Sequence, residues 1–263
     1  MQVLEKGEYV GVVRKEIRDE GMLASVSSYD QHEFFDAWHC HVNAHVSFVL
    51  QGGCSEKKKE SYERLPGKAT FYMAGEPHQI LNMYNSTHIN LEMDDAFFRQ
   101  YGLSDDLFGA IVTRTPDAKF LMLKVHKEIV ADDGFTSPSI HMLLLHFLQL
   151  AESWKDAGKI PAWLKIIYEV LNDRWNETPS LHDLSLATGI HPVTISHYFP
   201  RFFSCTLGAY MRKLKVEKAL HLIKSSDASL TDVAYECGFF DQSHFIRTFK
   251  QLTGYLPAQY KRI

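Results

Sequence analysis

The last third of the chain contains two copies of one residue pattern, centred on Gly189 and Gly238. Each glycine follows a leucine at eight residues, an apolar residue at five and a small residue at four. After it come an apolar residue, a polar residue able to cap a helix, and two apolar residues four apart. In this order the first copy has Leu181, Leu184, Ser185, Ile190, His191, Ile195 and Phe199, and the second has Leu230, Val233, Ala234, Phe239, Asp241, Phe245 and Phe249. The repeat restricts the fold strongly, because both copies must form the same local structure.

The pattern predicts a helix-turn-helix in each copy. Glycine allows the left-handed turn that ends a first helix, and the small residue lets two helices cross closely. The apolar pair four residues apart docks the second helix and leaves its other face free. One copy would also fit an all-helical interaction domain. Two copies, joined by the amphipathic stretch LGAYMRKLKVEKALHLIKS, favour a tandem helix-turn-helix domain.

The run 179–262 resembles the DNA-binding domain of the AraC/XylS family of bacterial transcription regulators. Its second copy, LTDVAYECGFFDQSHFIRTFKQLTGYLPAQYKR, is similar to the family signature over its whole length. The specific elements are Ala234, Gly238, Phe239, Ser243, Phe245, Arg247, Phe249, Gly254 and Pro257. The resemblance implies a cytoplasmic regulator with two units that enter successive major-groove segments of double-stranded DNA. For an activator it also implies RNA polymerase as a partner.

The resemblance assigns DNA contacts to the two second helices. In the second unit these are Gln242, Ser243, His244, Ile246, Arg247 and Lys250. In the first unit they are Val193, Thr194, Ser196, His197 and Arg201. Arg247 suits a bidentate contact with guanine or a phosphate, and Gln242 suits adenine or a phosphate. Lys250 suits phosphate alone.

The first unit departs from the family pattern at two positions. His197 stands where arginine is usual, and Pro200 stands where a basic residue is usual. Proline removes a hydrogen bond inside a helix, so the first recognition helix is predicted to stop near Phe199. Readout by this unit then shifts toward apolar contact between Val193 and a thymine methyl group.

The N-terminal two thirds predict an α+β multidomain chain. Short apolar runs such as SFVLQ, ATFYM and HINLEM, separated by glycine turns, predict a small β-sandwich or barrel over 1–95. Residues 96–160 have helical periodicity and form a predicted connector, and 161–263 form the all-α domain. The helices over 118–155 resemble the segment through which many family members form homodimers.

Charge and hydropathy agree with this division. The formal net charge is −4 for the whole chain, +3 over 161–263 and −7 over 1–160. A basic C-terminal part fits a nucleic-acid partner. No apolar run approaches the roughly 18 residues of a membrane span, and the start MQVLEKGEYVGVVRKE lacks the apolar core of a signal peptide. We therefore expect no membrane partner.

A histidine motif, WHCHVNAHVSFVLQGG, lies in the predicted strand region. On a strand His39 and His41 point to one face, and a strand that continues through the motif adds His45. The motif resembles the first cupin motif, with His45 in place of its usual glutamate. The later stretch GKATFYMAGEPHQILN resembles the second motif and supplies His78. The resemblance implies a cupin-like β-barrel in which these four histidines line an effector pocket and are candidate ligands of a divalent Zn, Ni, Fe or Cu ion.

Three interpretations of this pocket stay open. It could be the centre of a metal-dependent cupin enzyme, of the dioxygenase or isomerase type. It could be a sensory pocket that contains a metal. It could also be a metal-free sensory pocket that binds a small molecule, as in many AraC-type sensory domains. Because the DNA-binding pattern dominates the C-terminal third, we expect a regulator controlled by a small ligand or metal, and not an enzyme.

Overall fold

A computed structural model describes residues 1–29, 37–83, 85–155 and 161–263. The chain divides into two compact units, Met1–Leu145 and His146–Arg262. The described strands all belong to the first unit, and the second is helical. This mixture of sheet and helix, with helix-turn-helix units at the C-terminal end, agrees with the predicted fold class. No described helix has the length and hydropathy needed to cross a membrane.

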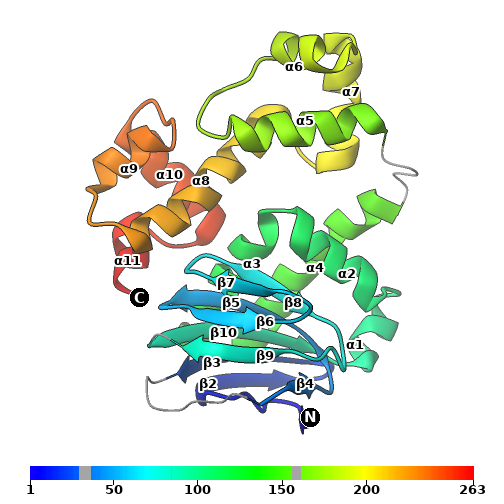
Figure 1. Cartoon of the computed structure of the whole chain (residues 1–263), viewed down its shortest axis with the longest axis vertical. Coiled ribbons are helices and arrows are strands. Elements are labelled where there is room, and N and C mark those ends of the chain that lie inside the picture. The colour runs from blue at the N-terminus through cyan, green and yellow to red at the C-terminus, as the bar shows by residue number, and fades with distance from the viewer. Residues whose placement is uncertain (30–36, 84, 156–160) are drawn as a thin grey trace. The chain divides into compact units, whose positions relative to one another are not determined.

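The first unit contains three sheets among its described residues (Figure 1). Strands β2 (Val12–Asp19), β3 (Met22–Tyr29), β10 (Ser86–Met93), β5 (Ala44–Gln51) and β8 (Ala69–Tyr72) form an antiparallel five-stranded sheet in that order. Strands β7 (Ser61–Arg64), β6 (Cys54–Lys57) and β9 (Gln79–Met83) form a second sheet, and β1 (Gln2–Leu4) pairs with β4 (His39–His41) in parallel.

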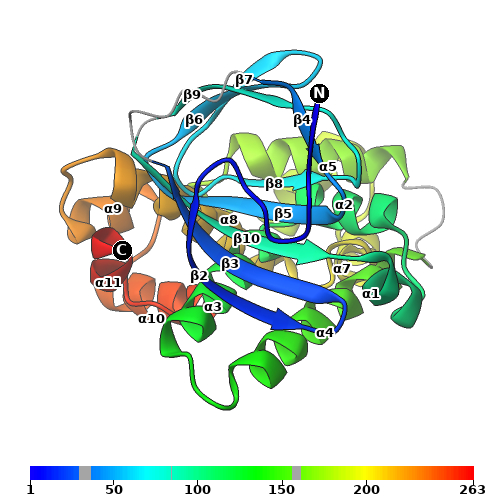
Figure 2. The same ribbon diagram turned by 90° about the horizontal axis from the view of Figure 1, so that it is seen from below.

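The central strands of the five-stranded sheet, β3, β10 and β5, are buried on both faces. In β10 the apolar Ile89, Leu91 and Met93 alternate with polar residues such as His88 and Asn90, and all of these side chains are buried. Alternate residues of a strand point to opposite faces. Helix α3 contacts β2, β3 and β10, and in Figure 2 it covers one face of the sheet while β6, β7 and β9 lie on the other side. Between the two sheets the interior is therefore polar.

Four helices follow the strands. Helices α1 (Asp95–Gln100), α2 (Asp105–Arg114) and α3 (Asp117–Ala131) belong to the first unit, and α4 (Thr136–Lys155) runs across the division after Leu145. The predicted helical periodicity over 118–155 is thus confirmed. The strands end at Met93, next to the predicted boundary at 95, and residues 156–160 at the other predicted boundary lie outside the described part. Both boundaries stay predictions.

The second unit contains the two predicted helix-turn-helix copies. Helices α6 (Leu181–Thr188) and α7 (Pro192–Phe203) form the first, and α9 (Leu230–Glu236) and α10 (Gln242–Thr253) form the second. Helix α5 (Ala162–Asp173) precedes them, α8 (Leu207–Ser225) joins them, and α11 (Pro257–Arg262) ends the chain. Both glycines of the repeat have positive φ, 71° at Gly189 and 68° at Gly238.

The repeat extends to the starts of the first helices. Ser180 and Asp183 form a capping box at α6, and Ser229 and Asp232 form the same box at α9. In each box the serine and the acidic residue satisfy backbone N–H groups that the helix leaves unpaired. The two units are therefore built on one local framework.

Helix α7 does not stop near Phe199, so that prediction is wrong. It continues through Pro200 to Phe203. The ring of Phe203 stacks on Phe199 at 4.2 Å and meets Tyr210 of α8 at 4.7 Å. Packing of this last turn against α8 offsets the backbone hydrogen bond that proline removes.

Candidate functional site

Helix α10 presents the predicted contact residues of the second unit. The Asp241 carboxylate caps it by accepting a hydrogen bond from the His244 N–H at 2.6 Å. Phe245 and Phe249 are fully buried and dock the helix. Ser243, Arg247 and Lys250 are exposed, and Gln242, His244 and Ile246 are half-buried. Within the described residues neither Arg247 nor Lys250 forms an ion pair, so both cations are available to a partner.

Helix α7 has a different outer face. His191 accepts a hydrogen bond from the Val193 N–H at 3.3 Å and caps the helix, and Val193 is 68% exposed. Ser196, His197 and Arg201 are also exposed, whereas Thr194 is half-buried.

The guanidinium of Arg201 is held by its own helix. Its Nη2 donates to His197 Nε2 at 3.3 Å, and its Cζ lies 5.0 Å from the ring centroid of Tyr198. Arg201 is therefore less free to meet a phosphate or a base than Arg247 is. The first helix-turn-helix unit presents Val193 as its most prominent apolar group.

Lys215 of α8 connects the turn of the second helix-turn-helix unit to the segment that precedes α6 in the first helix-turn-helix unit. Its Nζ donates to the Gly238 carbonyl at 2.7 Å and to Thr178 Oγ1 at 3.4 Å, and burial lowers the pKa of this ammonium. A Cβ on Gly238 would lie 1.8 Å from the Asn176 carbonyl oxygen. The sequence prediction omits Lys215, which lies between the buried Leu214 and Val216 and breaks the helical periodicity.

The four histidines of the N-terminal unit, Met1–Leu145, lie close together in the polar interior between its two larger sheets. Their side chains are 1–5% exposed. Strand β4 ends at His41 and β5 begins at Ala44, so the strand does not continue through the motif. The bend at 42–43 still brings the ring of His45 to 4.2 Å from that of His41. His78 joins them because its backbone bridges to His39.

Three of the histidines form a candidate metal centre. One ligand nitrogen from each of His39, His41 and His78 lies within 4.8 Å of the others. The Nδ1–H of His39 donates to the Ala37 carbonyl at 3.2 Å, and that of His78 donates to the Glu76 carbonyl at 3.1 Å. A carbonyl only accepts, so in both rings Nε2 keeps its lone pair for a metal. His45 lies outside this group of three and stacks on Tyr72 at 4.5 Å.

All four imidazoles are neutral at pH 7. Burial lowers the pKa of each, and neighbouring histidines lower the pKa of His41, His45 and His78 further, so that His41 reaches about 3 and His78 about 4. A metal binds the neutral imidazole, so low pKa values favour metal binding over protonation at pH 7.

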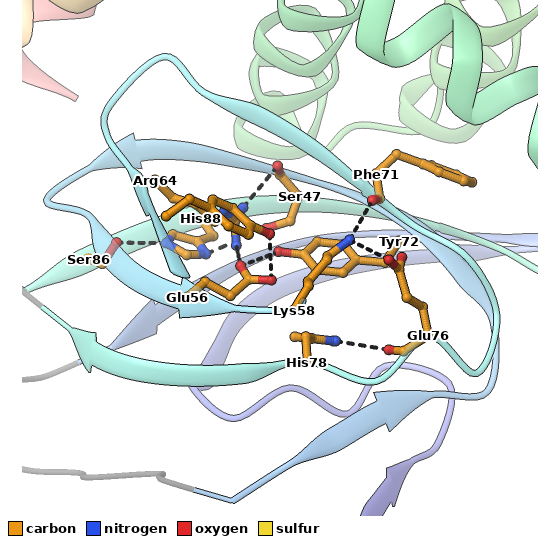
Figure 3. Close-up of polar contacts among 11 residues, drawn as sticks. Ser47, Glu56, Lys58, Arg64, Phe71, Tyr72, Glu76, His78, Ser86 and His88 are labelled. Atoms are coloured by element: carbon orange, nitrogen blue, oxygen red, sulfur yellow. Dashed lines mark hydrogen bonds and ion pairs between the residues drawn. The ribbon is translucent and has the colours of Figure 1, made fainter. Parts of the chain in front are cut away.

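A buried ion pair adjoins the histidines. Glu56 of β6 and Arg64 of β7 are 0% and 3% exposed, and Arg64 Nη1 lies 3.3 Å from Glu56 Oε2. Figure 3 shows Glu56 beside both Arg64 and Tyr72, whose hydroxyl donates to Glu56 Oε2 at 2.6 Å. The sequence prediction omits these residues. Their signal was the alternation of polar and apolar residues in strands that are buried on both faces.

The interior contains a small cavity with an accessible volume of about 20 Å³. It is lined by Tyr9, Val10, Tyr29, His39, His41, His45, Ser47, Arg64, Tyr72, His78, Ile80, His88 and Asn90. A water molecule needs roughly 10–15 Å³ measured in this way, so the cavity suits an ion with one or two small groups better than a large organic ligand.

Comparison with known proteins bears on the C-terminal part. Residues 184–263 match a family described as a helix-turn-helix domain. The uncharacterized HTH-type transcriptional regulator YijO of Escherichia coli K12 is 28% identical over 121 residues, 46% of this chain and 43% of the relative. The HTH-type transcriptional activator RhaS of Salmonella typhimurium LT2 is 26% identical over 138 residues, 50% of each chain. The chain thus spans about half the length of the curated relatives it matches.

Solved structures also resemble the chain. The DNA-binding domain of AdpA in complex with a target DNA shares 19% identity at a TM-score of 0.36, over 39% of this chain and 92% of that chain. An apo ToxT variant from Vibrio cholerae shares 10% identity at a TM-score of 0.38, over 95% and 99%. Residues 184–263 thus match the helix-turn-helix family, and the curated relatives that the chain resembles are HTH-type transcriptional regulators.

Proposed function

We propose that this protein is a sequence-specific DNA-binding transcription regulator. The observation that carries the proposal is the outer face of α10, which presents Arg247 and Lys250 without intramolecular ion pairs among the described residues. Such a face, one turn after a helix-turn-helix glycine, fits the major groove of double-stranded DNA. Arg247 contacts guanine O6 and N7, and Lys250 contacts phosphate.

The two units act together because α8 and Lys215 fix their separation. The buried ammonium of Lys215 joins the second turn to Thr178, next to the first unit. Rigid spacing lets both second helices enter successive major-groove segments without the entropy cost of ordering a flexible linker. Gln242, Ser243, His244 and Ile246 complete the second contact set. Val193, Thr194, Ser196, His197 and Arg201 form the first.

DNA binding is tested by selecting DNA fragments with the full-length protein and measuring affinity by fluorescence anisotropy. We expect affinity that falls steeply with salt, since phosphate contacts release counterions. Exchange of Arg247 for alanine should weaken the selected sequence much more than unrelated DNA. An absence of DNA binding at low salt would contradict the proposal.

We also propose that the N-terminal unit, Met1–Leu145, is a cupin-like sensory domain, in which His39, His41 and His78 hold a divalent transition metal. The donor set fits: three neutral imidazoles, two of them oriented by backbone carbonyls, face a cavity of ionic size. His45 is the fourth candidate ligand, since its ring lies 4.2 Å from that of His41. Such a metal would supply a charged centre that couples effector binding to the surrounding strands.

Control of DNA binding then follows from a population shift between DNA-competent and DNA-incompetent arrangements. Metal analysis of the purified protein should find about one ion per chain, and the paired substitution of His39 and His78 by alanine should abolish it. If that variant stays folded and loses the metal, its DNA affinity should no longer respond to added metal.

A homodimer through α3 and α4 is a further part of the proposal. Met142 of α4 is 66% exposed and is therefore accessible to a second copy of the chain.

The histidine cluster also favours a second candidate, a metal-dependent enzyme of the cupin type. The described residues that line the cavity include no carboxylate that could act as a general acid or base. Turnover of a substrate that disappears together with the metal in the His39 and His78 variant would favour the enzyme. DNA affinity that depends on the metal would favour the regulator.

A further inference from the structure

Arg64 lines the same cavity, and its buried Nε has no hydrogen-bond partner among the described residues. Arg64 uses its other nitrogens, Nη1 toward Glu56 at 3.3 Å and Nη2 toward the Ser47 carbonyl at 3.1 Å. An unpaired buried donor is destabilising, and more so when it belongs to a charged group. A ligand that accepts a hydrogen bond from Arg64 would remove this cost.

The charges around the cavity point to the sign of that ligand. Glu56 balances Arg64, and every other described residue that lines the cavity is an uncharged polar, aromatic, histidine or apolar residue. A divalent metal on His39, His41 and His78 therefore adds two positive charges that no carboxylate among the described lining residues offsets. Buried charge without a counter-charge is strongly unfavourable.

We propose that the cavity binds a small oxyanion of the carboxylate or carbonate class, which accepts a hydrogen bond from Arg64 Nε and completes the coordination of the metal. The proposal rests on the metal site proposed above. The accessible volume of about 20 Å³ limits the anion to a few non-hydrogen atoms, such as formate or bicarbonate. The protein then responds to metal and anion together, and Arg64 distinguishes an oxyanion from a spherical halide because its planar group donates directionally.

The test uses the full-length protein loaded with Co²⁺, whose visible absorption reports its ligands. Sodium formate and sodium bicarbonate are added in separate titrations at constant ionic strength, with sodium chloride as the reference. We expect a saturable spectral change with formate, bicarbonate or both, and none with chloride. A response to formate alone indicates a carboxylate, and a response to bicarbonate alone indicates a carbonate.

The assignment of Arg64 is tested by replacing the ion pair as a pair, Glu56→Gln with Arg64→Met, because removal of one member leaves a buried charge. The oxyanion affinity should fall at least about tenfold, the loss expected for one charge-assisted hydrogen bond. Tyr62→Phe is the matched control, since Tyr62 donates to Glu56 Oε1 at 2.9 Å but does not line the cavity. It should change the affinity less than about twofold.

If the double variant does not fold, Arg64→Lys replaces it, because lysine keeps the charge but lacks the planar donor. An unchanged spectrum with both oxyanions, an equal response to chloride, or equal oxyanion affinity in the Arg64 variant would overturn the proposal. Failure of Co²⁺ to bind would overturn it too, while the DNA-binding proposal is judged separately by anisotropy.

Discussion

The two helix-turn-helix units share a framework and differ in what they present. Both begin with a serine–aspartate capping box, turn at a glycine of positive φ, and bury an apolar pair four residues apart. On the outer face, α10 has two cations, Arg247 and Lys250, that form no ion pair with a described residue, whereas Arg201 of α7 contacts His197 and Tyr198.

The turns differ as well. Gly238 packs against the Asn176 carbonyl and Lys215, but nothing lies within 4 Å of a Cβ placed on Gly189. The second unit is thus both the more strongly charged and the more tightly anchored. We infer that it supplies most of the sequence readout, and that the first unit adds shape and apolar contact.

The largest difference between the units should come from alanine at the two glycines. Both substitutions force alanine into positive φ, which costs roughly 1 kcal/mol. At Gly238 the new Cβ also meets the Asn176 carbonyl at 1.8 Å, so the backbone must move. We expect Gly238→Ala to lower the free energy of unfolding by about 3 kcal/mol or more, and Gly189→Ala by about 1 kcal/mol, in chemical denaturation. Similar losses at both positions would contradict the difference in anchoring.

Alanine at the two arginines tests the difference in readout. Arg247→Ala should weaken binding to the selected DNA by about 1–3 kcal/mol, roughly 5- to 150-fold, because a bidentate base contact is lost. Arg201→Ala should cost less than about 1 kcal/mol, since Arg201 is already held by His197 and Tyr198. Anisotropy titrations of both variants measure these values. A larger loss for Arg201 would reverse the assignment.

The substitution Pro200→Ala tests whether proline destabilises α7, the second helix of the first helix-turn-helix unit. Restoring the missing backbone hydrogen bond should raise the free energy of unfolding by about 1 kcal/mol. Because Phe199 and Phe203 already hold the helix in place, DNA affinity should change little. Thermal and chemical unfolding provide the stability, and anisotropy provides the affinity. A large gain in affinity would show that Pro200 limits readout by α7.

The smallest effect is expected at Lys250. Lys250→Gln removes one phosphate contact, so the slope of log affinity against log salt should decrease in magnitude by about 1. Affinity should fall about equally for selected and unrelated DNA. His197→Gln is the matched exchange on α7, and it should leave the slope unchanged. A preference for particular bases that depends on Lys250 would indicate that this residue contacts a base edge.

Sequence periodicity predicted most of the helical domain because its signals are local. Glycine turns, capping serines and the pairs Ile195–Phe199 and Phe245–Phe249 each act within one or two helical turns. The course of α7 through Pro200 could not be predicted, because it depends on contact between Phe203 and Tyr210 of another helix. Lys215 was missed for the same reason.

In the N-terminal unit, Met1–Leu145, the sequence motifs identified the four histidines but not the residues that surround them. Arg64 and Tyr72 line the cavity and Glu56 contacts both, but the three residues come from three strands, and only the fold of those strands brings them together. The alternation of polar and apolar residues in β10 indicated two different faces. It did not indicate that both faces are buried, since that requires the second sheet and α3.

The most direct test of the central claim is the binding free energy of every single-base variant of the selected DNA site, measured for the wild type and for Arg247→Ala. We predict two contacted segments about 10 base pairs apart. Losses of binding free energy of about 1–3 kcal/mol per base should be concentrated in one of them. Arg247→Ala should flatten the penalty at one position of that segment. Equal affinity for all variants, or strong penalties that Arg247→Ala leaves intact while Arg201→Ala removes them, would contradict the claim.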